Sequence, residues 1–297
     1  MVDWQFMVLL LSNGVLIGLM YSLIALGFVL VYKATDAINF AQGEFVMIAG
    51  FVMAAGLHFY GVPLGGAIAG GILVMVAFGF GLERVMLRPL IGRPVVAIVM
   101  ATIGLAAILR GLGPLLWGAE TKALPLPVPD EPYVWGPLFI PPIQLLGAVV
   151  SLVFLGLFGW FFLKSRKGIA MRAVADSQQV AMAMGINVER YFALAWAMTG
   201  AVSALGGVIW GNLLGVDVHL ALVGLKVFPV VILGGLDSIP GAIVGGLLVG
   251  IVENVAAGYV DPYVGGGTKD FAPYVLMIVA LMLRPYGLFG KSIIERV

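Results

Sequence analysis

A short polar string interrupts the apolar sequence between residues 39 and 44. It reads Asn-Phe-Ala-Gln-Gly-Glu and brings two amides and a carboxylate close together. Asn39, Gln42 and Glu44 can hydrogen-bond a polar solute or its water, so we expect this string, with Phe40 and Gly43, to face a passage through the protein. The alternative is that these residues cap or end a helix at a membrane interface, where polar side chains cost little.

A second interruption, rich in glycine, lies between residues 234 and 241. Gly234, Gly235 and Gly241 surround the sequence Asp-Ser-Ile-Pro between two apolar stretches. A helix broken at membrane depth leaves backbone groups that protein or a water-filled cavity must cover. Paired interruptions in two parts of a chain are typical of inverted repeats around a transport path. We therefore expect these glycines to line the same passage as the polar string.

Three ionisable residues within apolar stretches lead to different predictions. Glu44 is costly in a membrane unless it faces protein or water, so it is the strongest candidate for function. Glu253 lies toward the end of its stretch, and we expect it at the interface. Arg110 lies near the outer end of its stretch, from which its long side chain can reach the lipid headgroups.

The most charged part of the chain runs from residue 164 to residue 190, where five cations stand against Asp176 and Glu189. A basic loop between long apolar runs is typical of a segment on the cytoplasmic side of a membrane. Within it, Ala175–Met184 is predicted to form a short helix that ends at Gly185. Its small apolar side chains suit docking into a groove of a partner protein. The alternative is a solvated loop that only fixes the topology.

Several kinds of chemistry lack the residues that they need. The chain has no cysteine, and His58 and His219 stand too far apart in sequence to suggest a metal site. No Ser/His/Asp set is visible, and the glycines at 265–267 lack the Lys-Ser/Thr of a phosphate-binding loop. A net charge of +1 argues against a nucleic-acid partner.

The composition is that of an integral membrane protein. The chain is 62% hydrophobic and 10% charged, with a mean hydropathy of +1.11, whereas a soluble domain is about 25% charged. A membrane-spanning helix needs about 20 apolar residues. The candidate stretches are Leu10–Tyr32, Asn39–Tyr60, Val62–Leu82, Val95–Trp117, Leu138–Leu163, Tyr191–Leu214, Leu220–Leu233, Ala242–Ala257 and Phe271–Leu283.

The positive charges orient these stretches. The turn at residues 83–93, the loop at 164–190 and the carboxyl-terminal tail should be cytoplasmic, which places Met1 outside. The count is nine crossings, or eight if Leu220–Leu233 is re-entrant, and with eight crossings the side of Met1 stays open. We expect an all-α, polytopic helix bundle with two inverted halves and broken helices. It forms a single transmembrane domain over residues 1–297, with halves at about 10–163 and 191–290 and the cytoplasmic loop at 164–190 between them.

Three stretches resemble the LivH-type permeases of branched-chain amino acid ABC importers. GLMYSLIALGFVLVYKATDAINFAQGEFVMIAGF (residues 18–51) is similar to the opening of that family. KGIAMRAVADSQQVAMAMGINVERYFALAWAMTGAVSALGGVIWG (167–211) is similar to its cytoplasmic coupling loop and next span. VILGGLDSIPGAIVGGLLVGIVEN (231–254) resembles its glycine-rich segment. The three stretches occur in the family's order along nearly the whole chain.

The resemblance implies a non-catalytic permease subunit in the cell inner (plasma) membrane. Its partners would be a LivM-type permease, LivG- and LivF-type ATPases and an external amino-acid-binding protein, within a lipid bilayer. The chain would bind no cofactor, and ATP and Mg would bind to the ATPases. The coupling helix seated in an ATPase would include Arg172, Ala175, Asp176, Ala181, Met184, Gly185 and Ile186.

Other functions remain open. The first is the same type of importer with urea, an amide or an aromatic acid as its solute. The second is a self-sufficient carrier or channel for a small polar solute, which usually has more intramembrane ionisable groups. A membrane-embedded enzyme would need catalytic groups gathered at one depth, and the scattered histidines argue against that class.

Overall fold

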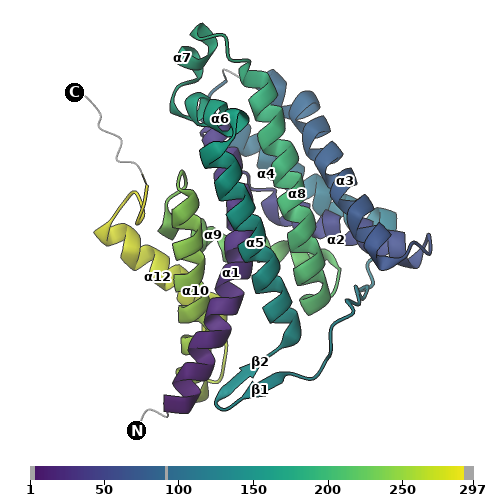
Figure 1. The fold of residues 1–297 in the computed structure, drawn as a ribbon, viewed down its shortest axis with the longest axis vertical. Helices are drawn as coiled ribbons and strands as arrows, with labels where there is room; N and C mark the ends of the chain where they lie inside the picture. Colours follow the sequence, from purple (N-terminus) through teal and green to yellow (C-terminus); the bar gives the residue numbers. More distant parts are fainter. Residues whose placement is uncertain (1–3, 91–92, 291–297) are drawn as a thin grey trace. The chain divides into compact units, whose positions relative to one another are not determined.

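The computed structural model describes residues 4–90 and 93–290, and most of these residues are helical (Figure 1). The long helices are α1 (Trp4–Thr35), α3 (Leu64–Leu82), α4 (Val95–Trp117), α5 (Pro142–Lys164), α8 (Val188–Leu214) and α10 (Ile239–Tyr259). The shorter helices are α2 (Gln42–His58), α6 (Arg166–Asp176), α7 (Gln178–Ala183), α9 (Leu222–Gly234), α11 (Asp261–Val264) and α12 (Thr268–Leu283). A π turn, η1 (Glu83–Leu87), and two 3-10 turns, η2 (Arg88–Leu90) and η3 (Val218–Ala221), complete the helical elements.

The predicted helical class is confirmed, with one small exception. Strands β1 (Tyr133–Trp135) and β2 (Leu138–Ile140) form an antiparallel hairpin in the stretch that leads to α5. Gly136 turns the hairpin with a φ of +60°, a conformation that glycine adopts without steric cost. Residues 1–3, 91–92 and 291–297 lie outside the described residues, so the predicted locations of Met1 and of the basic tail concern residues that the structure does not describe.

Six helices within the described residues are long and apolar enough to cross a membrane, judged by length and composition. Five are the helices α1, α4, α5, α8 and α10, and the sixth is α3 continued through η1 and η2 to Leu90. The other three predicted stretches correspond to α2, α9 and α12, which have 17, 13 and 16 residues. Each is shorter than the ~20 residues of a straight spanning helix.

The chain forms two compact units. Unit 1 contains residues 1–25, 127–154 and 225–297, and unit 2 contains residues 26–126 and 155–224. Helices α1, α5 and α9 each contribute residues to both units.

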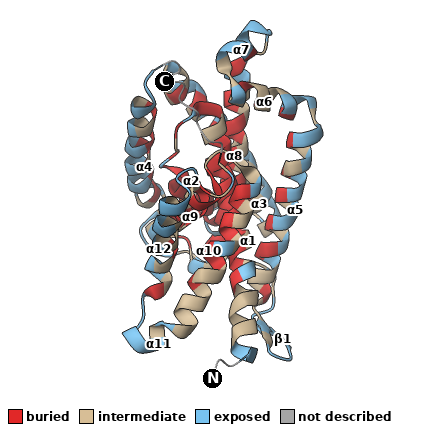
Figure 2. Cartoon of the chain, turned by 90° about the vertical axis from the view of Figure 1, so that its left-hand side faces the viewer, coloured by how far each residue is buried: buried red, intermediate tan, exposed pale blue. Residues whose placement is uncertain are grey.

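The core of unit 2 is formed by α2, α3 and α8. Most of α2 is buried, as is one side of α8 (Figure 2). Glycines of α8 lie against the backbone of neighbouring helices. A Cβ at Gly200 would lie 2.7 Å from the carbonyl carbon of Met75, and one at Gly207 would lie 2.8 Å from the amide nitrogen of Gly50. Small residues therefore permit the close approach of α3 and α2 to α8.

In unit 1, α10 runs beside the first half of α1 (Figure 1) and also contacts α12. A Cβ at Gly14 would lie 2.7 Å from the Cα of Ile251, and one at Gly18 would lie 2.8 Å from the Cα of Leu247. Glycines therefore let the backbones of α10 and the first half of α1 touch, because no side chain separates them.

Candidate functional site

The polar string forms the turn between α1 and α2 in unit 2. The turn begins at Asp36, whose φ is +53°, and α2 begins at Gln42. Asn39 Nδ2 donates to Gln42 Oε1 at 3.3 Å, and Gln42 Nε2 donates to Ser203 Oγ of α8 at 3.0 Å. The two amides therefore connect the turn to the middle of a long helix.

These amides are fully enclosed in the present conformation. Asn39, Gln42 and Ser203 are 0% exposed. The Gln42 amide packs directly against Gly27 of α1. A side chain at residue 27 would not fit, because even its Cβ would lie 2.9 Å from Gln42 Cδ. An unpaired buried amide costs about 1–3 kcal/mol, so the hydrogen bonds to Asn39 and Ser203 hold the Gln42 side chain in place.

Glu44 lies in the first turn of α2 and pairs with Arg110 of α4. The Glu44 side chain is 3% exposed and the Arg110 side chain is 50% exposed. The prediction that Arg110 reaches away toward the headgroups is wrong, because its guanidinium turns to the buried carboxylate. A buried carboxylate is costly without a compensating cation, so this ion pair accounts for Glu44 in an apolar helix.

The two remaining residues of the string lie in different environments. Gly43 is buried, and a Cβ there would lie 3.1 Å from the Cα of Gly224, so α2 approaches the start of α9 closely. Phe40 is 37% exposed, and its backbone N–H donates to Thr102 Oγ1 at 3.3 Å. Of the five residues of the string, only Phe40 has an exposed side chain in this conformation, and the other three residues predicted to face the passage, Gly234, Gly235 and Gly241, are buried.

The second interruption is a tight turn between α9 and α10 in unit 1. Gly235 has a φ of +105°, and the Oγ of Ser238 caps α10 by accepting from the N–H of Gly241 at 3.0 Å. The carbonyl of Gly234 accepts from the N–H of Phe289 at 3.0 Å. The glycines let the turn approach the segment after α12 closely. Backbone N–H groups of that segment therefore supply hydrogen bonds to backbone carbonyls of the turn.

The charged loop folds into two short helices. Ser165 caps α6 by accepting from the N–H of Gly168 at 2.8 Å, and α6 ends at Asp176. Ser177 is extended, with φ −161° and ψ 112°, and its Oγ accepts from the N–H of Val180 at 3.3 Å to cap α7. The helix predicted over residues 175–184 is therefore divided at Ser177. A serine that bonds the backbone ahead of it favours a helix start over a helix interior.

The end of the short helix agrees with the prediction. Gly185 has a φ of +79°, which terminates the helical stretch as expected. The loop residues differ in exposure. Ala181 is 2% exposed and packs inward, whereas Val180, Met182 and Met184 are 61%, 56% and 77% exposed. The exposed large apolar side chains of α7 and its C-terminal cap are therefore Val180, Met182 and Met184.

The predicted coupling residues share this loop but not one surface. Asp176, Met184 and Gly185 are exposed, Arg172, Ala175 and Ile186 are half-buried, and Ala181 is buried.

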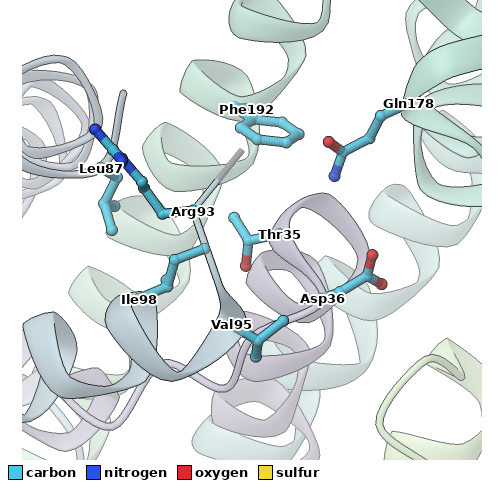
Figure 3. Close-up of a pocket in the computed structure, with 8 residues that line it drawn as sticks. All are labelled: Thr35, Asp36, Leu87, Arg93, Val95, Ile98, Gln178 and Phe192. Atoms are coloured by element: carbon cyan, nitrogen blue, oxygen red, sulfur yellow. The ribbon is translucent and has the colours of Figure 1, made fainter. Parts of the chain in front are cut away.

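A pocket of about 210 Å³ lies in unit 2 beside α7 (Figure 3). It is lined by Thr35, Asp36, Leu87, Arg93, Val95, Ile98, Gln178 and Phe192. Gln178, the first residue of α7, donates from Nε2 to the carbonyl of Ala34 near the end of α1 at 3.3 Å. Burial raises the pKa of the Asp36 carboxyl above its ordinary value. One hydrogen bond thus joins the charged loop to the helix that leads into the polar string.

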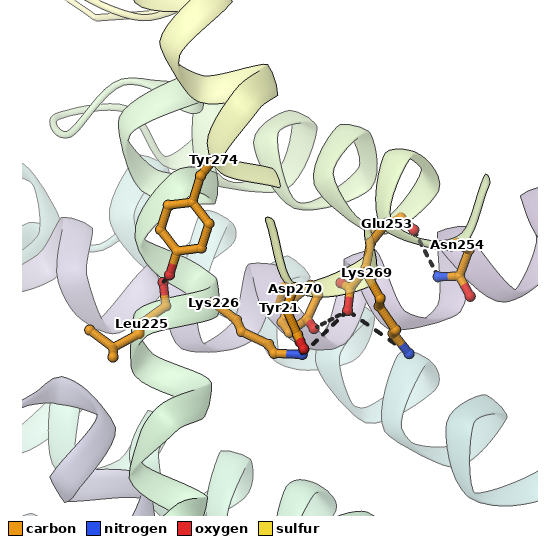
Figure 4. Close-up of polar contacts among 9 residues, drawn as sticks. Tyr21, Leu225, Lys226, Glu253, Asn254, Lys269, Asp270 and Tyr274 are labelled. Atoms are coloured by element: carbon orange, nitrogen blue, oxygen red, sulfur yellow. Dashed lines mark hydrogen bonds and ion pairs between the residues drawn. The ribbon is translucent and has the colours of Figure 1, made fainter. Parts of the chain in front are cut away.

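Four charged side chains and a tyrosine gather in unit 1 (Figure 4). Glu253 of α10 is 1% exposed, so its carboxylate is enclosed by other side chains of the protein. Its Oε1 accepts from Tyr21 Oη at 3.2 Å and lies 3.7 Å from Lys226 Nζ and 3.9 Å from Lys269 Nζ. Lys226 Nζ also lies 2.8 Å from Asp270 Oδ1. A buried carboxylate requires compensating cations, and α9 and α12 supply them.

The described residues contain no group of three histidine, cysteine, aspartate or glutamate side chains arranged to hold a metal ion.

The sequence matches the model of the family described as "Branched-chain amino acid transport system / permease component" over residues 10–283. The chain belongs to this family. It is a permease component, and with its six long apolar helices it is a multi-pass membrane protein.

Curated relatives align with nearly all of this permease. The high-affinity branched-chain amino acid transport system permease protein LivH of Escherichia coli strain K12 is 33% identical over 300 residues, which cover 96% of each chain. BraD of Pseudomonas aeruginosa, which has the same description, is 35% identical over 304 residues and 97% of each chain. A probable LivH protein of Methanocaldococcus jannaschii is 29% identical over 298 residues, covering 95% of this chain and 92% of that one.

A solved structure shares the fold of the permease. PsaBC from Streptococcus pneumoniae, solved in complex with a Fab, superposes with a TM-score of 0.52 over 93% of this chain and 92% of that chain, at 14% sequence identity. At this identity the similarity concerns the fold alone.

Sequence reasoning missed several residues of the permease that carry polar contacts. Tyr21, Lys269 and Asp270 drew no attention as ionisable groups, and Gln178 was only part of the loop helix. Lys226 did give a signal, since a lysine interrupts an otherwise apolar stretch. A charge at such a position needs a partner, but the sequence does not name the partner.

Proposed function

We propose that this chain is the membrane-spanning permease subunit of an ATP-driven ABC importer for branched-chain amino acids in the cell inner (plasma) membrane. The observation that carries the proposal is the family match over residues 10–283. Relatives named as branched-chain amino acid permeases that align along nearly the whole chain support it. The chain itself catalyses no reaction and binds no cofactor.

The proposed importer pairs this permease with a LivM-type permease, LivG- and LivF-type ATPases that bind ATP and Mg, and an external amino-acid-binding protein. Solute moves by alternating access, in which the path faces one side of the membrane at a time. Eight or nine crossings come from the six long helices together with short ones such as α2, α9 and α12. The single transmembrane domain has halves at about 10–163 and 191–290, joined by the cytoplasmic loop 164–190.

In this proposal the segment 172–186 contacts an ATPase. Exposed apolar side chains support that role, because Val180 and Met182 of α7 and Met184 at its C-terminal cap are available to a groove of a partner. The hydrogen bond from Gln178 to the carbonyl of Ala34 gives movement of α7 a direct route to the end of α1. The turn at 36–41 and the polar string follow immediately.

The residues at 39–44 and the glycine turn at 234–241 are proposed to lie along the solute path. The polar groups of Asn39 and Gln42 are paired within unit 2 in the present conformation. We propose that alternating access rearranges these hydrogen bonds when α1 and α8 move, so that the amides meet solute in another conformation.

The test is reconstitution of the complete importer in proteoliposomes. Leucine, isoleucine and valine should be taken up only when ATP, both ATPases and the binding protein are present. A panel with urea, a short amide and an aromatic acid distinguishes the solute classes. Uptake of urea in preference to leucine would overturn the substrate, and ATP-independent uptake by the chain alone would favour a self-sufficient carrier.

A further inference from the structure

Two cations and two anions meet at one place in unit 1. We define the charge cluster as Lys226 of α9, Glu253 of α10, and Lys269 and Asp270 of α12 (Figure 4). Lys226 Nζ lies 2.8 Å from Asp270 and 3.7 Å from Glu253, while Lys269 Nζ lies 3.9 Å from Glu253. The formal charges of the cluster therefore sum to zero.

The cluster is closed on one side and open on the other. The Glu253 side chain is 1% exposed, and those of Lys226, Lys269 and Asp270 are 33%, 45% and 73% exposed. At the closed end, the Oε1 of Glu253 accepts from Tyr21. Charged groups therefore extend from a buried carboxylate to a surface that the described part of the chain leaves uncovered.

The second oxygen of the buried carboxylate is unused. Glu253 Oε2 has no hydrogen-bond partner among the described residues, although it is buried. An unpaired buried acceptor is costly, and the cost is greater for a charged group. Since Oε1 already takes the tyrosine and both lysines, Oε2 is the atom available to an incoming hydrogen-bond donor.

Two residues next to the cluster in sequence have exposed apolar side chains. Leu225 precedes Lys226 in α9 and is 53% exposed, and Phe271 follows Asp270 in α12 and is 55% exposed. Within a membrane protein, charges beside such a surface require water, a partner or a ligand. The neighbourhood thus combines a balanced set of charges with exposed apolar side chains.

We propose that the charge cluster binds the zwitterionic head group of an α-amino acid during its passage through the permease. The ammonium of the ligand donates to Glu253 Oε2 and Asp270, and its carboxylate pairs with Lys226 and Lys269. A zwitterion adds no net charge to a neutral cluster, whereas an anion or a cation would leave one charge uncompensated in a poorly solvated place. The aliphatic side chain of the ligand lies toward Leu225 and Phe271. This proposal rests on the proposed function and adds a site to it.

The competing explanation is that the cluster is an internal lock that only holds α9, α10 and α12 together. The two explanations differ when both members of a pair are neutralised. Removing a whole ion pair is often neutral for stability, whereas removing one member leaves an uncompensated charge. If the cluster only holds the three helices together, leucine binding and uptake should recover in the double variant Lys226→Met/Glu253→Gln. If the cluster binds the ligand, leucine binding and uptake should not recover, because the double variant has lost groups that hold the ligand.

The experiment uses the complete importer, with radiolabelled leucine as the probe. Uptake is measured in proteoliposomes, and equilibrium binding is measured on the same complex in nanodiscs. The variants are Glu253→Gln, Lys226→Met and the double variant. Glu83→Gln is the matched control, because Glu83 has a 1% exposed side chain paired with Arg88, whose side chain is 33% exposed. The Lys226–Glu253 pair has the same two exposures.

We expect Glu253→Gln to weaken leucine binding by about tenfold to a hundredfold, the effect of losing one charge-assisted hydrogen bond. The double variant should remain as weak, while Glu83→Gln binds as the wild type does. The wild type should prefer leucine to its α-keto acid, which lacks the ammonium, and Glu253→Gln should reduce this preference.

Three outcomes would overturn the proposal. Glu253→Gln could bind leucine like the wild type, the double variant could recover binding and uptake, or the α-keto acid could compete as well as leucine does in the wild type. Any of these, in a wild-type importer that transports leucine with ATP, removes the site but leaves the proposed function intact. A wild-type complex that neither binds nor transports leucine overturns the proposed function and this site with it.

Discussion

The ion pair between Glu44 and Arg110 should respond very unequally to removal of its two members. Glu44 is enclosed, with a side chain 3% exposed, while the Arg110 side chain is 50% exposed. Arg110→Met leaves a carboxylate that cannot reach water. Glu44→Gln leaves a guanidinium on a long, half-exposed side chain, which can turn outward to a polar surrounding.

The magnitudes follow from this asymmetry. Breaking a buried ion pair by removing one partner costs about 3–5 kcal/mol, and the half-exposure of Arg110 lowers our expectation for Arg110→Met to about 2–3 kcal/mol. Glu44→Gln should cost about 1 kcal/mol or less, as for an exposed pair. The double variant should match Glu44→Gln, because no uncompensated charge remains. For a chain of this size, the loss in Arg110→Met corresponds to a melting temperature about 3–5 °C lower.

Thermal unfolding of the purified permease in one detergent, followed by intrinsic fluorescence, measures the three variants together. Uptake by the assembled importer is measured in parallel, and we expect Glu44→Gln to impair uptake although it melts near the wild type. If Glu44→Gln is the least stable of the three, or if the double variant is no better than Arg110→Met, the argument from unequal burial is wrong. Unchanged uptake in Glu44→Gln would make Glu44 a structural residue.

The remaining predictions concern the charged loop and the pocket beside it. Met182→Glu should abolish co-purification of the ATPases without changing the melting temperature of the permease, because this side chain faces outward from α7. The control is Gln179→Glu at a neighbouring exposed position, which should reduce co-purification of the ATPases less. Gln178→Ala removes the hydrogen bond to the carbonyl of Ala34 and should lower leucine uptake more than ATP hydrolysis; equal losses of both would contradict a transmitting role. Burial raises the pKa of Asp36 above 3.8, so protonation favours the folded state and stability falls as the pH rises through the raised pKa. Asp36→Asn, which tolerates the same backbone conformation, should melt with a smaller dependence on pH over that range, and an unchanged dependence would rule out Asp36 as its source.

The polar string has a structural role that its pattern alone did not reveal. Asn39 and Gln42 were open to two interpretations, a passage or a helix end. In the structure they hydrogen-bond to each other, and Gln42 bonds to Ser203, which is 161 residues further along the chain. Which helix a buried amide meets depends on how helices pack, and a sequence pattern contains only local spacing.

The charged loop shows what local chemistry can predict. The helix stop at Gly185 follows from the glycine itself, because a left-handed residue ends a helix wherever it occurs. The division at Ser177 was equally local, yet it was missed because the apolar spacing appeared continuous across it. The inward placement of Ala181 depends on packing, so the sequence could not separate it from the exposed Met182 and Met184.

The sequence by itself determined that this is a helical membrane protein, where its apolar stretches are interrupted, and where its cations gather, since hydropathy and charge are properties of each segment alone. Only the tertiary structure decided the partners of its buried charges. Glu253 meets Tyr21 from 232 residues away, and Arg110 turns to Glu44 across 66 residues. A buried charge must find compensation, but which distant group supplies it is set by the packing of helices whose glycines let their backbones touch.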